Sequence, residues 1–246
     1  MQMSSGKRSG DSDTRHARQG RDDINRTVGF VTQETVATRQ GSALVVFLDV
    51  YGFSGMVQQH QATPEDLFHR LLRAQQAVQT ELLRSPAKPQ VFSFSDSFFL
   101  VYHQERSFGE ALHACLEDVK RTMMLFLERG FPMRGGISYG KVLADRNLLV
   151  GEAVLNAVAY ERLIVAPLVL LPARELPSAN DAAILAIRGR LKHVPIRGGG
   201  TMKAFVVLPD DKDLFRSIAQ ARLDSCATDG PYDAASAWAL ALQFCH

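Results

Sequence analysis

The sequence predicts a mixed α/β fold in which the first elements follow the order β-α-β-β-α-β. Short apolar runs rich in β-branched residues alternate with longer segments whose apolar residues recur at helical spacing. Of the 246 residues, 46% are hydrophobic and 22% are charged. This composition supplies a sizeable core and excludes a disordered chain.

The first strand and the first helix have the clearest signals. Ala43–Val50, ALVVFLDV, is an apolar run typical of a buried central strand. Thr63 is suited to cap a helix in which Pro64 takes the first position and acidic residues follow in the first turn. The apolar face of this helix comprises Leu67, Leu71, Ala74, Val78 and Leu82.

A hairpin and a second helix follow. Val91–Phe94 and Phe98–Tyr102 flank the polar turn Ser95-Asp96-Ser97, and Ser107 with Glu110 forms a capping box that starts a helix. This order indicates the ferredoxin-like arrangement. The later predicted elements are a strand at Met133–Tyr139, a helix at Gly151–Leu163, a strand at Pro167–Leu171 and closing helices at Asp213–Leu223 and Ala234–Phe244.

Charge and composition divide the chain into three parts. We expect a flexible polar tail at residues 1–40, one domain at 41–208, and a helical extension at 209–246 that packs on the same domain. The tail holds seven basic and five acidic residues, so the rest of the chain is neutral, 21 − 21 = 0. A neutral body argues against nucleic acid or an acidic membrane as main partner.

Cysteine usage and hydropathy indicate a compartment. The three cysteines are odd in number and lack metal or redox spacing, which favours a reduced protein of the cytoplasm. The N-terminal segment has no apolar core of the kind found in signal peptides, and no apolar run is long enough to span a bilayer. We therefore expect a cytoplasmic protein.

Two aspartates are candidates for chemistry. Asp49 ends the apolar run of the first strand, where a carboxylate must be paired, hydrogen-bonded or bound to metal. The alternative is that Asp49 caps the turn at Gly52, and that Asp96 is an ordinary turn residue. We expect the first strand to lie beside the strand that follows the first helix, which brings Asp49 and Asp96 together. Such a pair suits Mg²⁺ or Mn²⁺.

A small-residue turn follows Asp49 directly. Tyr51-Gly52-Phe53-Ser54-Gly55 exposes backbone N–H groups before a helix, as polyphosphate-binding turns do. Two carboxylates beside such a turn are typical of two-metal phosphoryl transfer on a nucleoside triphosphate.

These residues carry a family resemblance. Phe47–Ser54, FLDVYGFS, resembles the metal-binding segment of class III nucleotide cyclase domains, and Phe94–Phe98, FSDSF, takes the place of their Gly-Asp hairpin. Arg134–Gly140, RGGISYG, is similar to their Arg-x-Gly-Ile-x-x-Gly strand. Ile196–Phe205 resembles their late strand pair. The resemblance runs from about residue 43 to 208, which leaves the tail and the last helices outside it.

The resemblance implies a fold, ligands and an assembly. The fold is the ferredoxin-like cyclase domain with extra C-terminal strands and helices, and the assembly is a homodimer with composite active sites. Two Mn²⁺ or Mg²⁺ ions per site are implied, held by Asp49, Asp96 and the Val50 carbonyl. Backbone amides hold the β- and γ-phosphates, and they belong to Gly52, Phe53 and Ser54.

The sequence also departs from purine cyclases at the base. Phe92 stands where they carry a lysine, and Leu149 falls near their base-reading aspartate. Two apolar side chains offer adenine or guanine no hydrogen bonds. Tyr51, where a smaller aliphatic residue is usual, could narrow the pocket toward a pyrimidine, or could simply pack under the helix.

Departures at the catalytic cations are equally clear. The transition-state Asn and Arg of the family align with Leu155 and Ala159, or in a shifted register with Asn156 and Tyr160. No arginine aligns in either register. The late triphosphate lysine falls on glycine, but Arg197 lies two residues away and could substitute.

Within the superfamily, the chain resembles the bacterial pyrimidine cyclases of the Pycsar antiphage system. Ser-Asp-Ser in the hairpin, Tyr51, and Ala-Tyr-Glu at residues 159–161 carry this resemblance. It implies conversion of UTP to 3′,5′-cyclic UMP and pyrophosphate, with the cyclic nucleotide activating a separate effector. The alternatives are a cytidylate cyclase acting on CTP, a purine cyclase, and a cyclase-like module that binds nucleotide without turnover.

Overall fold

The computed structural model describes residues 38–58, 63–103, 107–229 and 232–245. The predicted flexible tail therefore lies outside the described residues, apart from its last three positions. The first strand, β1 (Arg39–Val50), begins slightly before the predicted domain start at residue 41. Among the helices described, none is both long enough and apolar enough to cross a membrane.

The predicted β-α-β-β-α-β order is confirmed. After β1 come the short helix α2 (Phe53–Gln58) and then α3 (Pro64–Arg84). The Thr63 side chain accepts from the Asp66 amide at 3.2 Å, as the capping signal predicts. The unit is completed by β2 (Gln90–Phe94), β3 (Ser97–His103), α4 (Phe108–Leu127) and β4 (Met133–Ala144).

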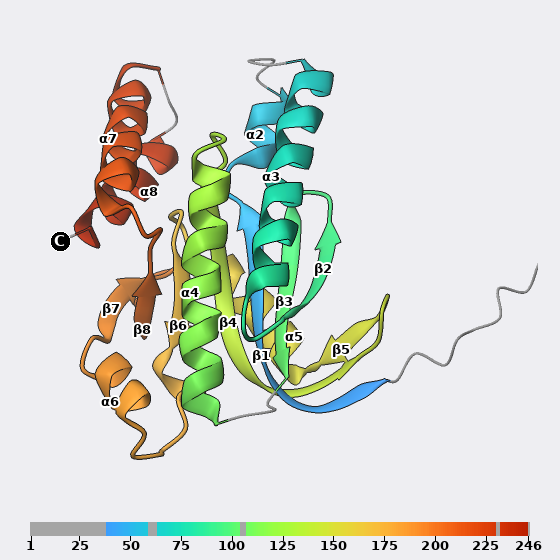
Figure 1. The fold of residues 1–246 in the computed structure, drawn as a ribbon. Helices are drawn as coiled ribbons and strands as arrows, with labels where there is room; N and C mark the ends of the chain where they lie inside the picture. Colours follow the sequence, from blue (N-terminus) through green and yellow to red (C-terminus); the bar gives the residue numbers. More distant parts are fainter. Residues whose placement is uncertain (1–37, 59–62, 104–106, 230–231, 246) are drawn as a thin grey trace, which may run out of the picture. The chain divides into compact units, whose positions relative to one another are not determined.

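The rest of the chain extends this unit at one edge. β4 runs further than predicted and turns back as β5 (Leu149–Gly151), so the next helix, α5, covers Glu152–Leu163. Figure 1 shows these elements in order. The remaining elements are β6 (Val169–Pro172), η1 (Ala173–Glu175), α6 (Ala182–Arg188), β7 (Lys192–Pro195), β8 (Thr201–Val207), α7 (Lys212–Asp229) and α8 (Tyr232–Gln243).

The sheet places β1 at its centre. Its order is β2-β3-β1-β4-β6-β8-β7, with β5 paired to β4. The expectation that β1 lies beside the strand after the first helix is wrong, because that strand, β2, pairs only with β3. β3 is the more buried of the two hairpin strands and takes the inner position. β1 runs antiparallel to both β3 and β4.

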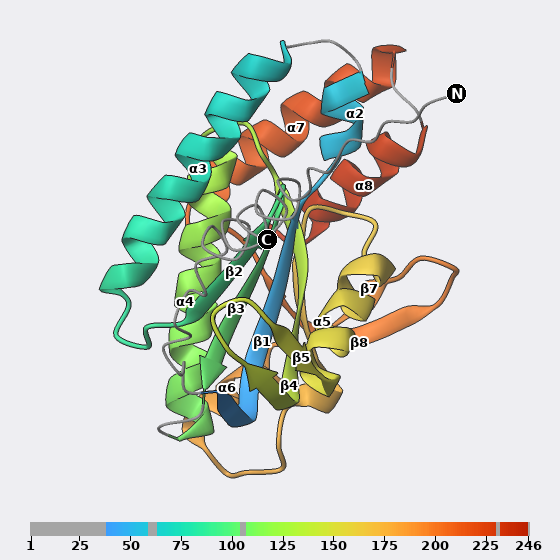
Figure 2. The ribbon, with the colours of Figure 1, turned by 90° about the vertical axis from the view of Figure 1, so that its right-hand side faces the viewer.

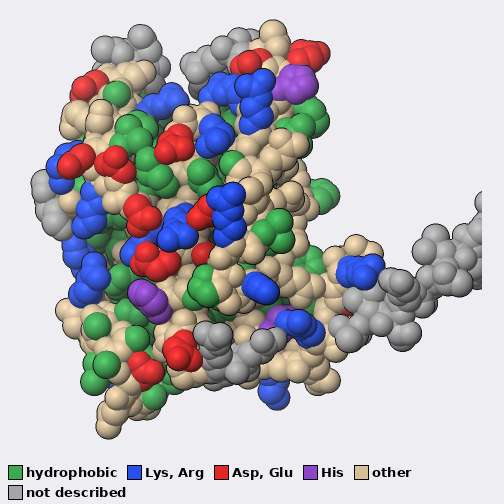
Figure 3. Space-filling view, viewed as in Figure 1, with side chains coloured by type: hydrophobic (Ala, Val, Ile, Leu, Met, Phe, Trp, Pro, Cys, Tyr) green, Lys and Arg blue, Asp and Glu red, His purple; other side chains and the backbone are tan. Residues whose placement is uncertain are grey.

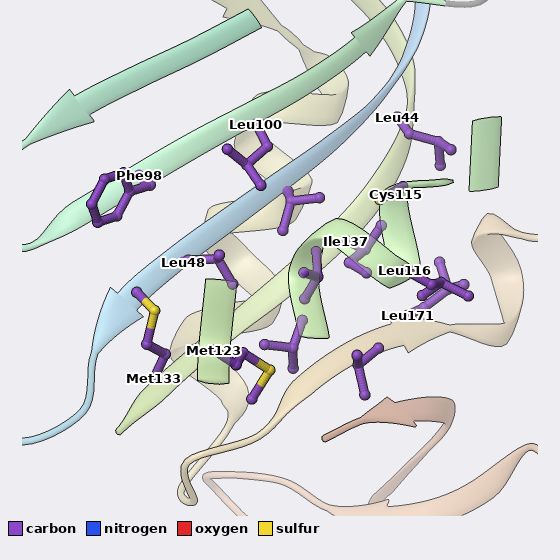
Figure 4. Close-up of a cluster of buried hydrophobic side chains, with 14 of the residues drawn as sticks. Leu44, Leu48, Phe98, Leu100, Cys115, Leu116, Met123, Met133, Ile137 and Leu171 are labelled. Carbon is purple, nitrogen blue, oxygen red and sulfur yellow. The ribbon is translucent and has the colours of Figure 1, made fainter. Parts of the chain in front are cut away.

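Helices cover both faces of this sheet. α3 and α4 lie on one face and α5 on the other, as Figures 1 and 2 show together. Alternate residues of β1 therefore face different layers. Leu44 and Leu48 belong to the core under α3 and α4, which Figure 4 shows in close-up. Ala43 and Val45 pack instead with Ala153 of α5. By this alternation Asp49 lies on the α5 face.

The closing helices have their own core. Phe215 of α7 and Trp238 of α8 are buried in one apolar cluster with Leu170 of β6 and Ala204 of β8. α7 and α8 therefore pack against the β6–β8 side of the sheet, which positions them beside the C-terminal end of β1.

Candidate active site

Strand register fixes the surroundings of Asp49. This residue lies opposite Ser97 of β3 and Arg134 of β4. The Ser97 hydroxyl donates to Asp49 Oδ1 at 2.8 Å, and Arg134 Nη2 donates to Oδ2 at 3.3 Å. Both carboxylate oxygens are thus engaged with neighbouring strands, and no hydrogen bond from Asp49 to the Gly52 turn is found among the described residues. The turn-capping alternative therefore does not describe Asp49.

Asp96 lies at the turn of the β2–β3 hairpin, next to Ser97. Burial raises the pKa of the Asp96 carboxyl, and the negative charge of Asp49 raises it further. Ser97, the residue after Asp96, is the cross-strand partner of Asp49 and donates to it, so the strand register brings the two aspartates to neighbouring positions. The sequence-predicted convergence of Asp49 and Asp96 is present, although it depends on β3 and not on β2 as the neighbour of β1.

A large cavity opens onto both aspartates. Its volume is about 1000 Å³, and Asp49, Val50 and Asp96 form part of its wall. In Figure 3 a hollow is visible at the top, between the α7 side and the α2–α3 side, with Lys and Arg side chains along its border. Three arginines line the cavity, and they come from α3, β4 and α7: Arg70, Arg134 and Arg222.

The glycine turn after β1 borders the same cavity. Gly52 has φ +77°, a left-handed conformation that favours glycine, and α2 starts directly after it. Gly52, Phe53 and Ser54 all line the cavity. The first amides of a helix have no partner within that helix, so they are available to an anion. The predicted phosphate-binding turn and the two aspartates therefore line the same cavity.

Arg134 and Glu161 form a buried ion pair that sequence reasoning missed. Arg134 Nε lies 2.5 Å from Glu161 Oε1, and Glu161 of α5 is only 4% exposed. Burial raises the pKa of the Glu161 carboxyl, the positive charge of Arg134 lowers it, and Asp49 raises it again. Arg134 thus connects two carboxylates and holds α5 against the strand that carries the site. A glutamate on the buried face of a predicted helix was the available signal.

Phe92 and Leu149 line a second hollow, which is separate from the aspartate cavity. This hollow, of about 490 Å³, lies between the β2–β3 and β4–β5 hairpins and includes Phe99, Arg146 and Asn147 in its wall. Ser97 also lines it. Ser97 of this second hollow donates to Asp49, which lines the aspartate cavity, so the second hollow and the aspartate cavity adjoin.

Tyr51 lies in the aspartate cavity and not in this second hollow. Its ring meets Trp238 edge-on, with centroids 6.0 Å apart, and the Arg134 guanidinium lies 5.8 Å from the ring centroid. Tyr51 therefore packs against α8, a C-terminal helix that the sequence does not suggest as its neighbour, while part of its surface borders the cavity.

The other predicted site residues do not line the aspartate cavity in the part of the chain described. Tyr160 is fully buried, its hydroxyl contacts Glu175, and it accepts from Arg174 Nε at 2.7 Å. Burial and Glu175 raise the pKa of Tyr160 to about 12. Asn156 is half-buried on α5, and Arg197 is exposed in the β7–β8 turn.

The donor set at the aspartates fits Mg²⁺ or Mn²⁺. These ions prefer oxygen ligands, and Mg²⁺ is usually held by one or two carboxylates together with substrate phosphates. Asp49 and Asp96 are two such carboxylates, and both line the same cavity. Among the described residues, no group of three or more His, Cys, Asp or Glu side chains gathers at one place.

The fold is shared with guanylyl cyclase domains. The crystal structure of the guanylyl cyclase Cya2 matches with a TM-score of 0.50 at 13% identity, over 70% of this chain and 95% of that one. The dimeric guanylyl cyclase domain of the RhoGC fusion protein from the aquatic fungus Blastocladiella emersonii matches with a TM-score of 0.51 at 14% identity, over 70% and 97%. No family model and no curated protein matches the sequence. The predicted cyclase fold is confirmed.

Proposed function

We propose that this protein is a nucleotide cyclase that converts a nucleoside triphosphate to its 3′,5′-cyclic monophosphate and pyrophosphate. One observation carries the proposal: Asp49 and Asp96, from separate strands, border one cavity with the glycine turn and three arginines. The aspartates can bind metal ions, and the arginines and backbone amides can bind phosphates. Together these groups suit a nucleoside triphosphate with its metal ions. The fold shared with guanylyl cyclase domains supports the same reading.

The chemistry follows from the residues of the cavity. Asp49, Asp96 and the Val50 carbonyl would hold two Mn²⁺ or Mg²⁺ ions, which lower the pKa of the ribose 3′-hydroxyl and neutralise charge at the α-phosphate. The O3′–Pα bond forms as the bond from Pα to the bridging oxygen breaks. The hydroxyl proton leaves to solvent, and pyrophosphate departs with the bonding electron pair.

The chain's own side chains orient this reaction. Ser97 and Arg134 fix the Asp49 carboxylate from two neighbouring strands, so it does not have to reorganise during the reaction. Arg134 in turn is held by Glu161. The Gly52–Ser54 amides receive the β- and γ-phosphates. Arg70 is anchored on the Arg129 carbonyl at 2.7 Å and adds positive charge at the cavity wall.

We propose UTP as the preferred substrate, with CTP as the first alternative. Phe92 and Leu149 line one hollow, so a base placed there would meet apolar side chains at those positions. Each unpaired polar group on a buried purine edge costs roughly 1–3 kcal/mol. The preference for UTP over CTP rests on the resemblance to the Pycsar cyclases. On the same basis, cyclic UMP would act as a second messenger in antiphage defence and reach a separate effector.

We propose further that the protein acts as a homodimer with composite sites. Apolar side chains are exposed on the β4–β5 hairpin and on α5. On the hairpin, Leu143 of β4 and Val150 of β5 are direct cross-strand partners. Their exposed fractions are 43% and 52%, and Leu155 of α5 is 74% exposed. A second copy would cover such a surface. By the resemblance to class III cyclases, Asn156 of α5 would then reach the partner's aspartates.

Product identification tests the proposed function. Purified protein is incubated with ATP, GTP, UTP and CTP together, with Mn²⁺, and the products are identified by mass spectrometry. We expect cyclic UMP and pyrophosphate in equal amounts. Cyclic AMP or cyclic GMP as the main product would contradict the pyrimidine preference. Binding of triphosphates without any cyclic product would contradict the enzyme function and would indicate a nucleotide-binding module.

A further inference from the structure

The C-terminal helices form one wall of the aspartate cavity. The lining residues from these helices are Arg222, Ser225 and Cys226 of α7 and Ala234 and Trp238 of α8. The sequence resemblance to nucleotide cyclases ends near residue 208, before either helix begins. The chain therefore completes this cavity with a segment for which the resemblance provides no counterpart.

Arg222 differs from the other two arginines of the cavity. Arg134 is paired with Asp49 and Glu161, and Arg70 contacts Asp66 at 3.9 Å and the Arg129 carbonyl. For Arg222, no carboxylate lies within ion-pair distance and no hydrogen-bond partner is found in the part of the chain that the structure describes. A guanidinium that faces a cavity without an acidic partner is suited to an anionic ligand.

We propose that Arg222 binds the triphosphate of the substrate and takes the place of a cation that purine cyclases carry elsewhere. This inference rests on the proposed function. In those enzymes an arginine on the helix corresponding to α5 and a late lysine provide positive charge, and here no arginine aligns and the lysine falls on Gly199. Arg222 restores a cation at the same cavity from α7, an element outside the resemblance. It is a substrate-binding residue for the β- and γ-phosphates.

The chemistry of the cavity favours phosphate over other anions. The Gly52–Ser54 turn offers amides to the same cavity, and Asp49 and Asp96, which would hold the metal ions, line it too. A triphosphate carries about four negative charges, so charge-assisted hydrogen bonds from guanidinium groups are the strongest available contacts.

Equilibrium binding tests this role without turnover. The dissociation constants of Mg²⁺-pyrophosphate, of a non-hydrolysable UTP analogue and of UMP are measured calorimetrically for wild type, Arg222→Gln and Arg222→Lys. We expect Arg222→Gln to bind pyrophosphate and the analogue roughly 10- to 100-fold more weakly, with UMP unchanged. Arg222→Lys keeps the charge and should lose less. Lys212→Gln, on the same helix but lining a different hollow, is the matched control and should bind as wild type does.

The outcomes separate this inference from the proposed function. Equal affinity of wild type and Arg222→Gln for pyrophosphate, or an equal loss for UMP, overturns the role of Arg222 even if wild type produces a cyclic nucleotide. A selective loss for pyrophosphate supports the role even if no cyclic product forms, and the proposed function then fails alone. Thermal melting of each variant checks that the fold is intact, which the exposed position of Arg222 leads us to expect.

Discussion

At the scale of single residues, the site depends on how Arg134 is shared between two carboxylates. It contacts Asp49 at 3.3 Å and Glu161 at 2.5 Å, and its side chain is 22% exposed. Glu161 is more deeply buried than Asp49 and therefore gains most from the pairing. The pair keeps the guanidinium beside Asp49, where its positive charge partly offsets the negative charge of the Asp49 carboxylate at the cavity.

Removing Glu161 should therefore lower the stability of the fold. We expect Glu161→Ala to lower the free energy of unfolding by about 1–3 kcal/mol, because Arg134 loses the more deeply buried of its two carboxylate partners and keeps Asp49. The exposed Glu65→Ala in the first turn of α3 is the control and should change stability by less than about 1 kcal/mol. Urea unfolding followed by circular dichroism measures both. A Glu161→Ala protein as stable as the control would show that the pair contributes nothing.

The two aspartates could be predicted from sequence, whereas this ion pair could not. Asp49 ends an apolar strand and Asp96 occupies a hairpin turn, so each has a local signal. Arg134 and Glu161 belong to different elements, and only the packing of α5 on β4 brings them together. Tyr160 aligns with a catalytic position of the family, but the structure places its hydroxyl in buried contacts with Glu175 and Arg174. The alignment gives no signal for these contacts.

At the scale of elements, a close approach of α5 to β4 determines where Glu161 lies. A methyl group at Gly136 of β4 would meet the Ala157 carbonyl oxygen and lie 2.6 Å from Tyr160 Cβ. Only glycine allows the helix to lie this near to the strand. The RGGISYG segment therefore serves packing at its second glycine, beside its contribution of Arg134 to the site.

Gly136→Ala should displace α5. We expect a loss of about 1–3 kcal/mol in the free energy of unfolding, because the extra methyl forces the helix away from the sheet. Gly41→Ala in β1 is the matched control, since nothing lies within 4 Å of a methyl there. Thermal and urea unfolding compare the two variants. Equal stability of the two variants would mean that α5 can shift without loss of stability, and would contradict the requirement for glycine at position 136.

Local periodicity predicted most elements correctly, and the errors have identifiable causes. The sequence predicts no strand at β5, which has only three residues, although Asp145 forms the turn before it by accepting from the Asn147 and Leu148 amides. The expectation that β2 lies beside β1 is wrong because element order alone does not say which strand of a hairpin is the inner one. The greater burial of β3 decides this.

At the scale of the whole molecule, the proposed homodimer assigns different parts of one site to two chains. Asp49 and Asp96 border one cavity, whereas Phe92 and Leu149 line a separate hollow in the same chain. Exposed apolar side chains on the β4–β5 hairpin and on α5 indicate where the second copy would pack. The C-terminal helices lie on the cavity side and would stay with the aspartates of their own chain.

Mixing two inactive variants tests this assembly. We expect Asp49→Ala and Asn156→Ala each to be inactive alone, and their mixture to regain up to about a quarter of wild-type activity. Half of randomly formed dimers are mixed, and each mixed dimer has one intact site of two. Cyclic nucleotide formation is measured after subunit exchange. A mixture as inactive as its components, or a fully active monomer in analytical ultracentrifugation, would argue against composite sites.

The central claim is that Asp49 and Asp96 together form the centre of a cyclisation reaction. Its most direct test is the rate of cyclic nucleotide formation from UTP by Asp49→Ala and Asp96→Ala, beside Asp213→Ala, whose side chain is 91% exposed on α7. We expect both site variants to fold normally and their rates of cyclic nucleotide formation to be below detection, because each loses half of the carboxylate charge that would hold the metal ions. Asp213→Ala should form cyclic nucleotide at the wild-type rate. Substantial cyclic nucleotide formation by folded Asp49→Ala would contradict the account.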